Sequence, residues 1–296
     1  MDFPFVSVIV PTCNREEPLC KALQALFNQD YPNYEVIVVD QTRQHAPQTL
    51  SFLESNRDKF RHYHLDETAG LPSARNFGVR QAKGEIILFC DDDVITRRDF
   101  IKYHAANYEA PQVGGVVGKI ESTRQEQQPF ALFELKIVGG KVVLSGRYLC
   151  NWNTDEKKYV FSGRGANMSF RKDLFYKVGG FDPSFIGTHS YEDVDFSYRL
   201  RDIGANIIYE PQALATHQFY PTGGCRLDYK VKAEYFRFHN AMLFYLKNMN
   251  KFFLPYMLTI FFLIAIKKIL IPTKSLKNFL YVLKGLWDGF RTYAVR

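Results

Sequence analysis

The chain begins with short apolar runs that alternate with longer segments whose apolar residues recur at helical spacing. The apolar, β-branched runs predict strands at residues 5–10, 34–39, 62–65 and 85–89. The pattern between them predicts helices over about 46–58 and 72–82, after a first helix that carries Leu19, Leu23, Leu26 and Phe27. Strands of this kind, separated by helices, are typical of parallel βαβ units. We therefore predict an α/β fold with helices on both faces of a mostly parallel sheet.

The regular alternation is lost over residues 122–160 and then resumes. Helices are expected at 172–178 and 191–204, and a strand is expected at 206–209. Beyond residue 225 the chain becomes basic, aromatic and helical in pattern. We therefore predict two parts, an α/β domain over 1–225 and a helical tail over 226–296.

Composition limits the class of protein. Of the 296 residues, 46% are hydrophobic and 23% are charged, which excludes a disordered chain and a disulfide-stapled mini-protein. The five cysteines are widely spread and form no CxxC pair, so we expect a reducing compartment. The first apolar run is preceded by Asp2 and not by basic residues, so we expect no signal peptide and a cytoplasmic N-terminal part.

The net charge of +7 is concentrated in the tail. Residues 226–296 hold 13 Lys+Arg against 3 Asp+Glu, whereas the first 225 residues hold 25 against 28. Such an asymmetry favours an anionic partner for the tail, either lipid or nucleic acid. Lysines on the solvated side of amphipathic helices would give the same count, so charge alone leaves both interpretations open.

Polar residues follow three of the predicted strands, at 11–15, 40–43 and 91–93. Ligands of open α/β sheets bind beyond the carboxyl ends of the strands, so we expect a binding site at this edge. The adjacent carboxylates of Asp91, Asp92 and Asp93 repel one another unless a cation or water neutralises them, and Mg²⁺ prefers such oxygen ligands. A solvated turn before the next helix is the alternative for this triplet.

A second acidic pair, Glu192 and Asp193, stands at a predicted helix start. By itself such a pair would only complement the helix dipole. Combined with a distant metal-binding triplet, it supplies a general base that is separate from the metal. His217 follows a strand and is either a metal ligand or a structural histidine. Arg75 either binds phosphate or lies on the surface.

Seven segments, taken in order, resemble glycosyltransferase family 2, the inverting sugar transferases of GT-A fold. They are VSVIVPTCNR (6–15), VIVVD (36–40), GLPSARNFG (70–78), FCDDD (89–93), GANMS (165–169), GGFD (179–182) and YEDVDF (191–196). Each segment alone is a weak signal, but seven in the right order are specific. The resemblance implies a GT-A glycosyltransferase domain over 1–225.

The resemblance also implies roles for individual residues. The first nucleotide-contacting loop is matched by Pro11, Thr12, Asn14 and Arg15, and the aspartate that accepts a hydrogen bond from the base is matched by Asp40. Residues of the nucleotide pocket are matched by Arg75 and Asn76, and we count Asp92 and Glu192 among the donor-binding residues. The DxD motif, which contacts ribose and holds the Mg²⁺ or Mn²⁺ bridging the diphosphate, is matched by Asp91 and Asp93. A further metal ligand is loosely matched by His217, and the catalytic base is matched by Asp193.

The activity that the resemblance implies is metal-dependent, inverting transfer of one sugar. The donor would be a nucleotide-diphosphate sugar, UDP- or dTDP-linked, and the acceptor a hydroxyl of a glycan, glycolipid or lipid-linked sugar. The QxxRW motif of processive synthases is missing, so single addition is expected. Asp40 is followed by Gln-Thr-Arg, where many relatives carry a second acidic residue or Asn, which leaves the base open.

Two alternatives remain at this point. One is a sugar-nucleotide nucleotidyltransferase, although residues 11–17 do not form the Gly-rich phosphate loop that it would be expected to need. The other is a non-catalytic, membrane-bound binder of sugar nucleotides. The sequence contains neither GxxxxGK[ST] nor GxGxxG, which argues against a P-loop NTPase and a Rossmann dehydrogenase. The acceptor side is expected to come partly from residues 122–160 and 217–225.

The tail has the pattern of a membrane-surface helix. Residues 252–266 carry no charge, but as a helix they reach only about 22 Å, short of the roughly 30 Å hydrocarbon core. One helical face carries Leu276, Phe279, Leu280, Leu283, Leu286, Trp287 and Phe290. We expect residues 250–291 to bind the anionic surface on the cytoplasmic side of the cell membrane, with no nucleic acid as partner. Two alternatives stay open, which are packing of these helices on the catalytic domain or on a second subunit, and a transmembrane span over 252–271. The sequence does not define the oligomeric state.

Overall fold

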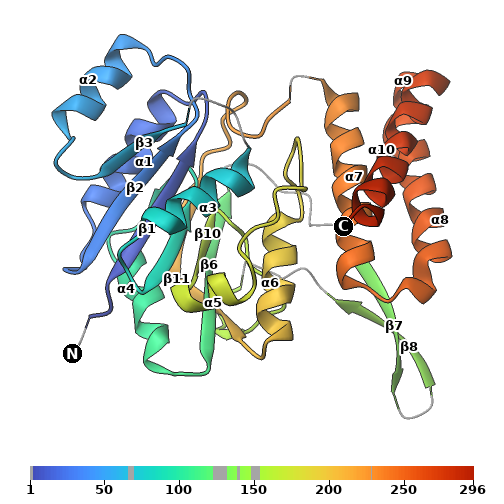
Figure 1. The fold of residues 1–296 in the computed structure, drawn as a ribbon, viewed down its shortest axis with the longest axis horizontal. Coiled ribbons are helices and arrows are strands. Elements are labelled where there is room, and N and C mark those ends of the chain that lie inside the picture. The colour runs from blue at the N-terminus through green and yellow to red at the C-terminus, as the bar shows by residue number, and fades with distance from the viewer. Residues whose placement is uncertain (1–2, 66–69, 123–131, 139–140, 148–153, 228) are drawn as a thin grey trace.

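A mixed sheet of nine strands forms the centre of the computed structural model (Figure 1). The structure describes residues 3–65, 70–122, 132–138, 141–147, 154–227 and 229–296. Eight of the strands follow the order β3-β2-β1-β4-β10-β6-β11-β5, and β9 pairs with β11 outside this path.

The first half of the sheet is parallel and agrees with the predicted βαβ pattern. Its strands are β1 (Val6–Thr12), β2 (Tyr34–Asp40), β3 (Arg61–His64) and β4 (Ile86–Cys90). The connecting helices are α1 (Glu17–Phe27), α2 (Pro47–Ser55) and α3 (Leu71–Gln81). Every residue of β1 and β4 is buried, as expected for strands that are covered on both faces.

The second half departs from the parallel pattern at β10 (Asn167–Arg171), which runs antiparallel to both β4 and β6 (Val113–Ser122). The long strand β11 (Asn206–His217) is parallel to β6 and antiparallel to β5 (Val94–Thr96) and β9 (Lys158–Tyr159). The α/β type of fold is confirmed, but the sheet is mixed where we expected it to be mostly parallel. The apolar composition of a buried strand does not encode its direction, because four of the five residues of β10 are buried although both of its neighbours run antiparallel to it.

Helices cover both faces of the sheet and produce two buried clusters. The remaining helices of this part are α4 (Phe100–Ala106), η1 (Asn107–Glu109), α5 (Lys172–Lys177) and α6 (Glu192–Asp202). One cluster joins Leu23 of α1 and Phe100 of α4 to Val8 of β1. The other joins Phe196 of α6 to Ile9 of β1. Neighbouring residues of one strand thus serve opposite cores, which fixes both helix layers relative to the carboxyl ends of the strands.

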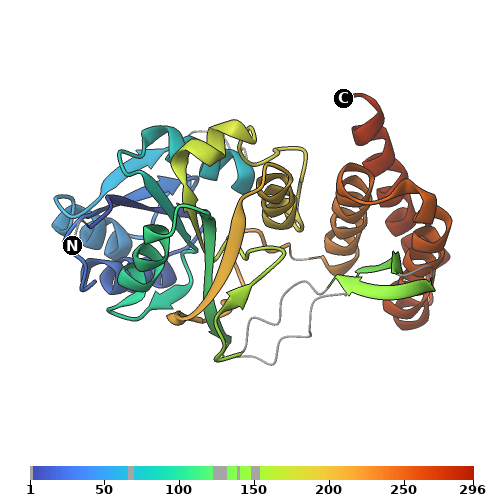
Figure 2. The same ribbon diagram turned by 90° about the horizontal axis from the view of Figure 1, so that it is seen from below.

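The C-terminal helices form a third cluster beside the sheet (Figures 1 and 2). They are α7 (Lys230–Asn248), η2 (Lys251–Phe253), α8 (Leu254–Ala265), η3 (Ile266–Leu270), α9 (Ile271–Thr273) and α10 (Leu276–Ala294). The stretch Lys251–Thr273 is one helix of 23 residues, long and apolar enough to be a candidate membrane span. Its length of about 34 Å exceeds the 22 Å expected from the uncharged run alone.

The predicted boundary at 225/226 lies in the segment between β11 and α7. A separate hairpin of β7 (Leu132–Val138) and β8 (Lys141–Arg147) lies next to the C-terminal helices in both views (Figures 1 and 2). Much of the region 122–160, which we expect to contribute to the acceptor side, lies outside the described residues. The division into two functional domains stays a prediction.

Candidate active site

The polar ends of three strands meet at one edge of the sheet, as the parallel pattern predicts. Thr12 closes β1 and stands opposite Asp40, which closes β2. The hydroxyl of Thr12 donates to Oδ2 of Asp92, just beyond β4, over 2.7 Å. Pro11 lies within β1, where it pairs in register with Val39. The loops predicted to form a site are therefore neighbours in the structure.

Arg75 of α3 joins the two acidic clusters that the sequence places about a hundred residues apart. Its guanidinium pairs with Glu192 at the start of α6, and its Nη2 lies 3.1 Å from Oδ1 of Asp91. The guanidinium carbon lies 5.3 and 5.5 Å from the ring centroids of Phe89 and Phe181, so aromatic rings also hold it. Burial raises the pKa of Glu192, and the positive charge of Arg75 opposes this shift. Arg75 is 1% exposed and is not a surface arginine.

Asp193 lies beside this bridge, at the first turn of α6. Its Oδ2 accepts from the amide of Gly165 over 3.0 Å, and its Oδ1 accepts from the amide of Val194 over 2.8 Å. The helix begins after Tyr191, whose φ of 72° is unusual for an aromatic residue. The Tyr191 ring stacks on Phe244 of α7 at 5.4 Å, which supports this conformation. The carboxylate of Asp193 is thus held in a defined direction by backbone donors.

The three adjacent aspartates have different surroundings, which removes the expected conflict between their charges. Burial raises the pKa of Asp92 to about 7, so this group is the one most easily neutralised. Burial also acts on Asp93, but hydrogen bonding and charge from His217, with the charges of Arg15 and Arg226, hold its pKa below the usual value. The carboxylate of Asp93 is therefore favoured in its anionic form.

A divalent cation fits part of the predicted ligand set. Among the described residues, no group of three His, Cys, Asp or Glu side chains is arranged to hold a metal ion. Oδ1 of Asp93 and Nε2 of His217 are 2.9 Å apart, about the separation of two neighbouring ligands at 2.1 Å from one cation. Asp91 faces Arg75 instead. One or two protein ligands supplemented by substrate phosphates are typical of Mg²⁺ sites.

Asp40 has partners that sequence reasoning missed. Its Oδ2 contacts Nε2 of His45 at 2.7 Å and Nε2 of His62 at 3.1 Å, and its Oδ1 accepts from the amide of Thr42 at 2.8 Å. Burial raises the pKa of this carboxyl, but these hydrogen bonds outweigh burial and lower the pKa to about 2. Glu16 contacts the other ring nitrogen of His45 at 3.2 Å. No local motif marks either histidine.

Asn14 and Asn76 have contacts within the protein. The amide nitrogen of Asn14, a residue with φ of 52°, donates to the hydroxyl of Thr42, which holds the β1 and β2 loops together. The side chain of Asn76 bonds both backbone groups of Phe181, at 2.7 and 2.8 Å. The structure therefore gives Asn76 contacts to the loop before α6 and does not show it among the carboxylates.

Comparison with known proteins agrees with this arrangement. The family model of glycosyl transferase family 2 matches residues 7–179. Glycosyltransferase AglE of Haloferax volcanii is 28% identical over 74% of this chain and 69% of its own length. The pre-mycofactocin glycosyltransferase of Mycobacterium tuberculosis is 29% identical over 72% of this chain, which spans only 42% of that relative.

Solved structures share the fold. Staphylococcus aureus TarS 1-349 in complex with UDP-GlcNAc superposes with a TM-score of 0.66 at 21% identity, covering 96% of this chain and 80% of that one. A mannosyltransferase from Pyrobaculum calidifontis in complex with GDP-Man and Mn²⁺ superposes with a TM-score of 0.58 at 18% identity, covering 100% of this chain and 76% of that one. The predicted fold and enzyme class are confirmed, and the chain belongs to glycosyl transferase family 2.

Proposed function

We propose that the protein is an inverting, metal-dependent glycosyltransferase that moves one sugar from a UDP- or dTDP-sugar to a hydroxyl of a glycan, glycolipid or lipid-linked acceptor. One observation carries the proposal: Arg75 bridges Asp91 and Glu192, so that the donor-side carboxylates and Asp193 form one cluster. A nucleotide-sugar site and a general base are the two parts that a single displacement at the anomeric carbon requires.

Asp193 is the proposed base. Two amide donors orient its carboxylate, which would take the proton from the acceptor hydroxyl as that oxygen attacks. The cation would be held by Asp93 and His217, where it would supply charge stabilisation of the nucleoside diphosphate leaving group as a Lewis acid. Thr12, Arg15 and Asp92 lie around this position and would contact the nucleotide.

We also propose that the C-terminal helices lie on the cytoplasmic face of the membrane. The outer apolar face is formed by exposed residues of η2, α8 and α10, namely Phe252, Tyr256, Leu258, Phe262, Leu263, Leu276, Leu280, Tyr281, Trp287 and Phe290. Phe279 and Leu286 of the predicted face instead pack inward, because α10 lies along α7. Lysines and Arg291 around this face suit anionic headgroups.

The packing of Lys251–Thr273 favours a surface position over a span. Lys268, within this helix, lies 3.8 Å from Glu234 of α7, which also pairs with Arg237. If Lys251–Thr273 spanned the membrane, Glu234 and Arg237 of α7 would be drawn toward the hydrocarbon with it, at a cost of several kcal/mol. An interfacial position leaves them in water.

Binding of a nucleotide panel tests the donor site. Calorimetry with UDP, dTDP, GDP and ADP, with and without Mn²⁺, should show metal-dependent binding of one pyrimidine diphosphate. We expect Asp93→Ala to lose this metal dependence. If none of the four binds to the wild type, the proposed function is wrong.

The base is tested under turnover conditions. Asp193→Ala should retain the donor affinity and lose at least 10²-fold in transfer, about the contribution of a general base. Retained transfer would contradict the role of Asp193 and would favour another base. Loss of transfer with unchanged nucleotide binding would separate the enzyme from a non-catalytic binder.

A further inference from the structure

The segment that follows β11 folds back over the candidate active site. The amide of Gln218 donates to the carbonyl of Asp93 over 2.9 Å, and the amide of Gly224 donates to the carbonyl of Cys13 over 2.7 Å. Gly223 has φ of 76°, and a Cβ there would lie 2.3 Å from the carbonyl oxygen of Asn14. The segment is therefore fastened to both the β4 loop and the β1 loop, which brings Arg226 to the site.

Two arginines converge on one carboxylate oxygen. Nη2 of Arg15 lies 3.1 Å from Oδ2 of Asp93, and Nη2 of Arg226 lies 3.3 Å from the same oxygen. His217 occupies the other oxygen. Asp93 is thus surrounded by more positive charge than one carboxylate neutralises, whereas a diphosphate could pair with both guanidinium groups.

Arg15 has hydrogen-bonding capacity left over. The residue is 4% exposed, and its Nε and Nη1 have no hydrogen-bond partner among the described residues. Nε lies 3.7 Å from Oδ1 of Asp92, too far for a hydrogen bond. Because an unsatisfied buried donor costs about 1–3 kcal/mol, these atoms favour an anionic oxygen as an additional partner.

Arg226 is the more accessible member of the pair. Its side chain is 29% exposed, against 5% for Arg15. Its guanidinium carbon lies 5.6 Å from the centroid of the Phe219 ring, and that of Arg15 lies 5.9 Å from the centroid of Tyr220, so both arginines rest on rings of the same segment. Arg226 can move toward a ligand in front of Asp93 without unfolding a helix or strand.

We propose that Arg226 binds the diphosphate of the donor together with Arg15, and that Asp93 holds Arg226 until the diphosphate arrives. This inference rests on the proposed function, because it concerns the donor of that reaction. A cation on Asp93 would compete with Arg226 for the carboxylate and would thereby release the guanidinium to the phosphates. Arg226 follows no motif of the family segments and was not identified from the sequence.

The test measures pyrophosphate and orthophosphate binding by calorimetry in EDTA. These ligands carry no nucleobase, and EDTA removes any metal that Asp93 could bind. Asp93→Asn should bind pyrophosphate about fivefold or more tightly than wild type, because it no longer holds Arg226. Arg226→Ala should bind it at least tenfold more weakly. The affinity for orthophosphate should change less in both variants, because orthophosphate offers fewer oxygens to two arginines.

The double variant distinguishes release of Arg226 from a general gain on removing a negative charge. If Asp93 acts by holding Arg226, Asp93→Asn should give a clearly smaller gain in the Arg226→Ala background, where only Arg15 is left to be released. An equal gain in both backgrounds would overturn the proposal, as would absence of pyrophosphate binding in both wild type and Asp93→Asn. Arg57→Ala, which removes a surface arginine paired with Glu54, is the matched control and should resemble wild type.

Failure of this inference and failure of the proposed function give different results. If the nucleotide panel shows metal-dependent binding but Arg226→Ala leaves pyrophosphate binding unchanged, only the role of Arg226 is wrong. If pyrophosphate behaves as expected but no nucleoside diphosphate binds, the anion site is present and the glycosyltransferase proposal is wrong.

Discussion

Gly165 shows how closely the bridge at the active site is packed. A Cβ at this position would lie 2.3–2.5 Å from three atoms of the Arg75 guanidinium. The same residue donates its amide to Asp193. One glycine thus sets the positions of the arginine between the acidic clusters and of the proposed base.

Gly165→Ala should therefore impair transfer more than stability. We expect a destabilisation of about 1–3 kcal/mol from overpacking and a fall in transfer of about 10²-fold, because Arg75 and Asp193 are both displaced. Urea unfolding and turnover assays measure the two effects. Gly204→Ala, where a Cβ meets open space and only the φ of 84° is unfavourable, is the control and should keep its activity. Normal turnover in Gly165→Ala would show that the bridge tolerates displacement.

His104 predicts a pH dependence of stability. Burial lowers its pKa from 6.5 to about 4, and the ring contacts Ser169 and Asn167 at 2.8 Å each. Below pH 6.5 His104 binds a proton in the unfolded chain but stays neutral in the folded protein until the pH approaches 4. Stability therefore falls as the pH decreases toward 4. This group should contribute a loss of about 3 kcal/mol between pH 7 and pH 4.

The variant His104→Gln should lack this part of the pH dependence. Its unfolding free energy, measured in urea from pH 7 to pH 4, should fall by about 3 kcal/mol less than that of wild type. Parallel pH curves for the two proteins would mean that folding does not change the pKa of His104.

At the residue scale, the sequence predicts the acidic groups and three of their basic partners, Arg15, Arg75 and His217, but it misses Arg226 and His45. Asp91, Asp93 and Asp193 stand directly after a buried strand or at a helix start, which are local signals. Arg226 and His45 reach the site through the tertiary path of the chain. No spacing rule identifies them, because each follows a segment without a regular period.

At the scale of elements, the first four strands and their parallel direction could be predicted, but the antiparallel direction of β10 could not. Residues 34–39 and 85–89 match β2 and β4 closely, since buried β-branched runs are a strong local signal. The direction of β10 depends on its pairing with β4 and β6. Partners far apart in the chain decide this, so the pattern within β10 carries no information about it.

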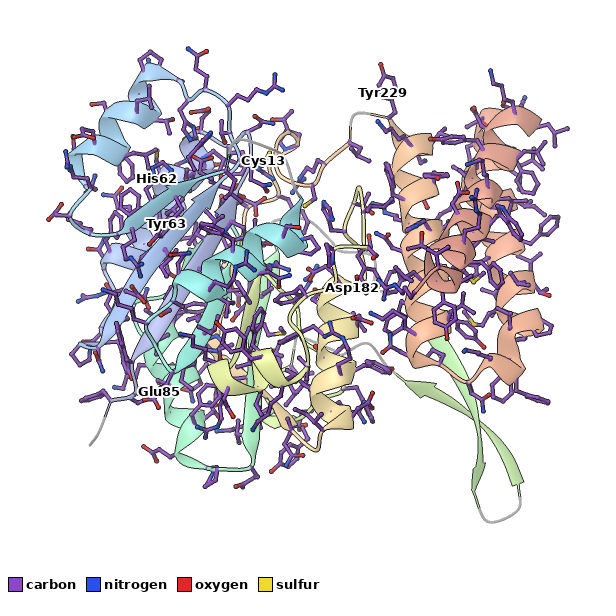
Figure 3. All side chains as sticks on the ribbon, viewed as in Figure 1. Cys13, His62, Tyr63, Glu85, Asp182 and Tyr229 are labelled. Carbon is purple, nitrogen blue, oxygen red and sulfur yellow. The ribbon has the colours of Figure 1, made fainter. Side chains whose placement is uncertain are left out.

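Helix α6 depends on α7 for its position. Nζ of Lys247 on α7 lies 2.6 Å from Asp182, which Figure 3 labels, and 2.8 Å from Asp195, which is fully buried on α6. Asn248 donates to Asp195 as well. Lys247 and Asn248 therefore fasten the C-terminal helices to the helix of the proposed base.

Lys247→Met should leave two carboxylates with fewer partners and destabilise the protein by about 3 kcal/mol. Urea unfolding measures this loss. We expect kcat to fall while the donor affinity stays within twofold, because the nucleotide contacts lie on other elements. Lys177→Met, at an exposed pair with Asp173, should change stability by less than about 0.5 kcal/mol. Unchanged stability in Lys247→Met would show that α7 docks through its apolar contacts alone.

At the scale of the molecule, the proposed membrane-binding helices and the proposed donor site reside in separate parts of the chain. Replacing Phe262 and Leu263 with Glu should abolish flotation with phosphatidylglycerol vesicles, because both side chains belong to the outer apolar face. Nucleotide binding should be unchanged. Tyr159→Glu, an exposed aromatic on β9, is the control and should float like wild type. Flotation of the double variant would indicate that another surface meets the lipid.

The contacts of α7, including those of Lys247, set the distance between the C-terminal helices and the proposed base. Because Lys247, Asn248 and the stacked rings of Tyr191 and Phe244 join α7 to α6, the proposed membrane-binding surface should hold Asp193 at a fixed height above the headgroups. An acceptor must raise its hydroxyl to that height to be glycosylated. Among lipid-linked acceptors, the enzyme should then favour those whose spacer between anchor and hydroxyl has the matching length, whatever the identity of the sugars that make up the spacer.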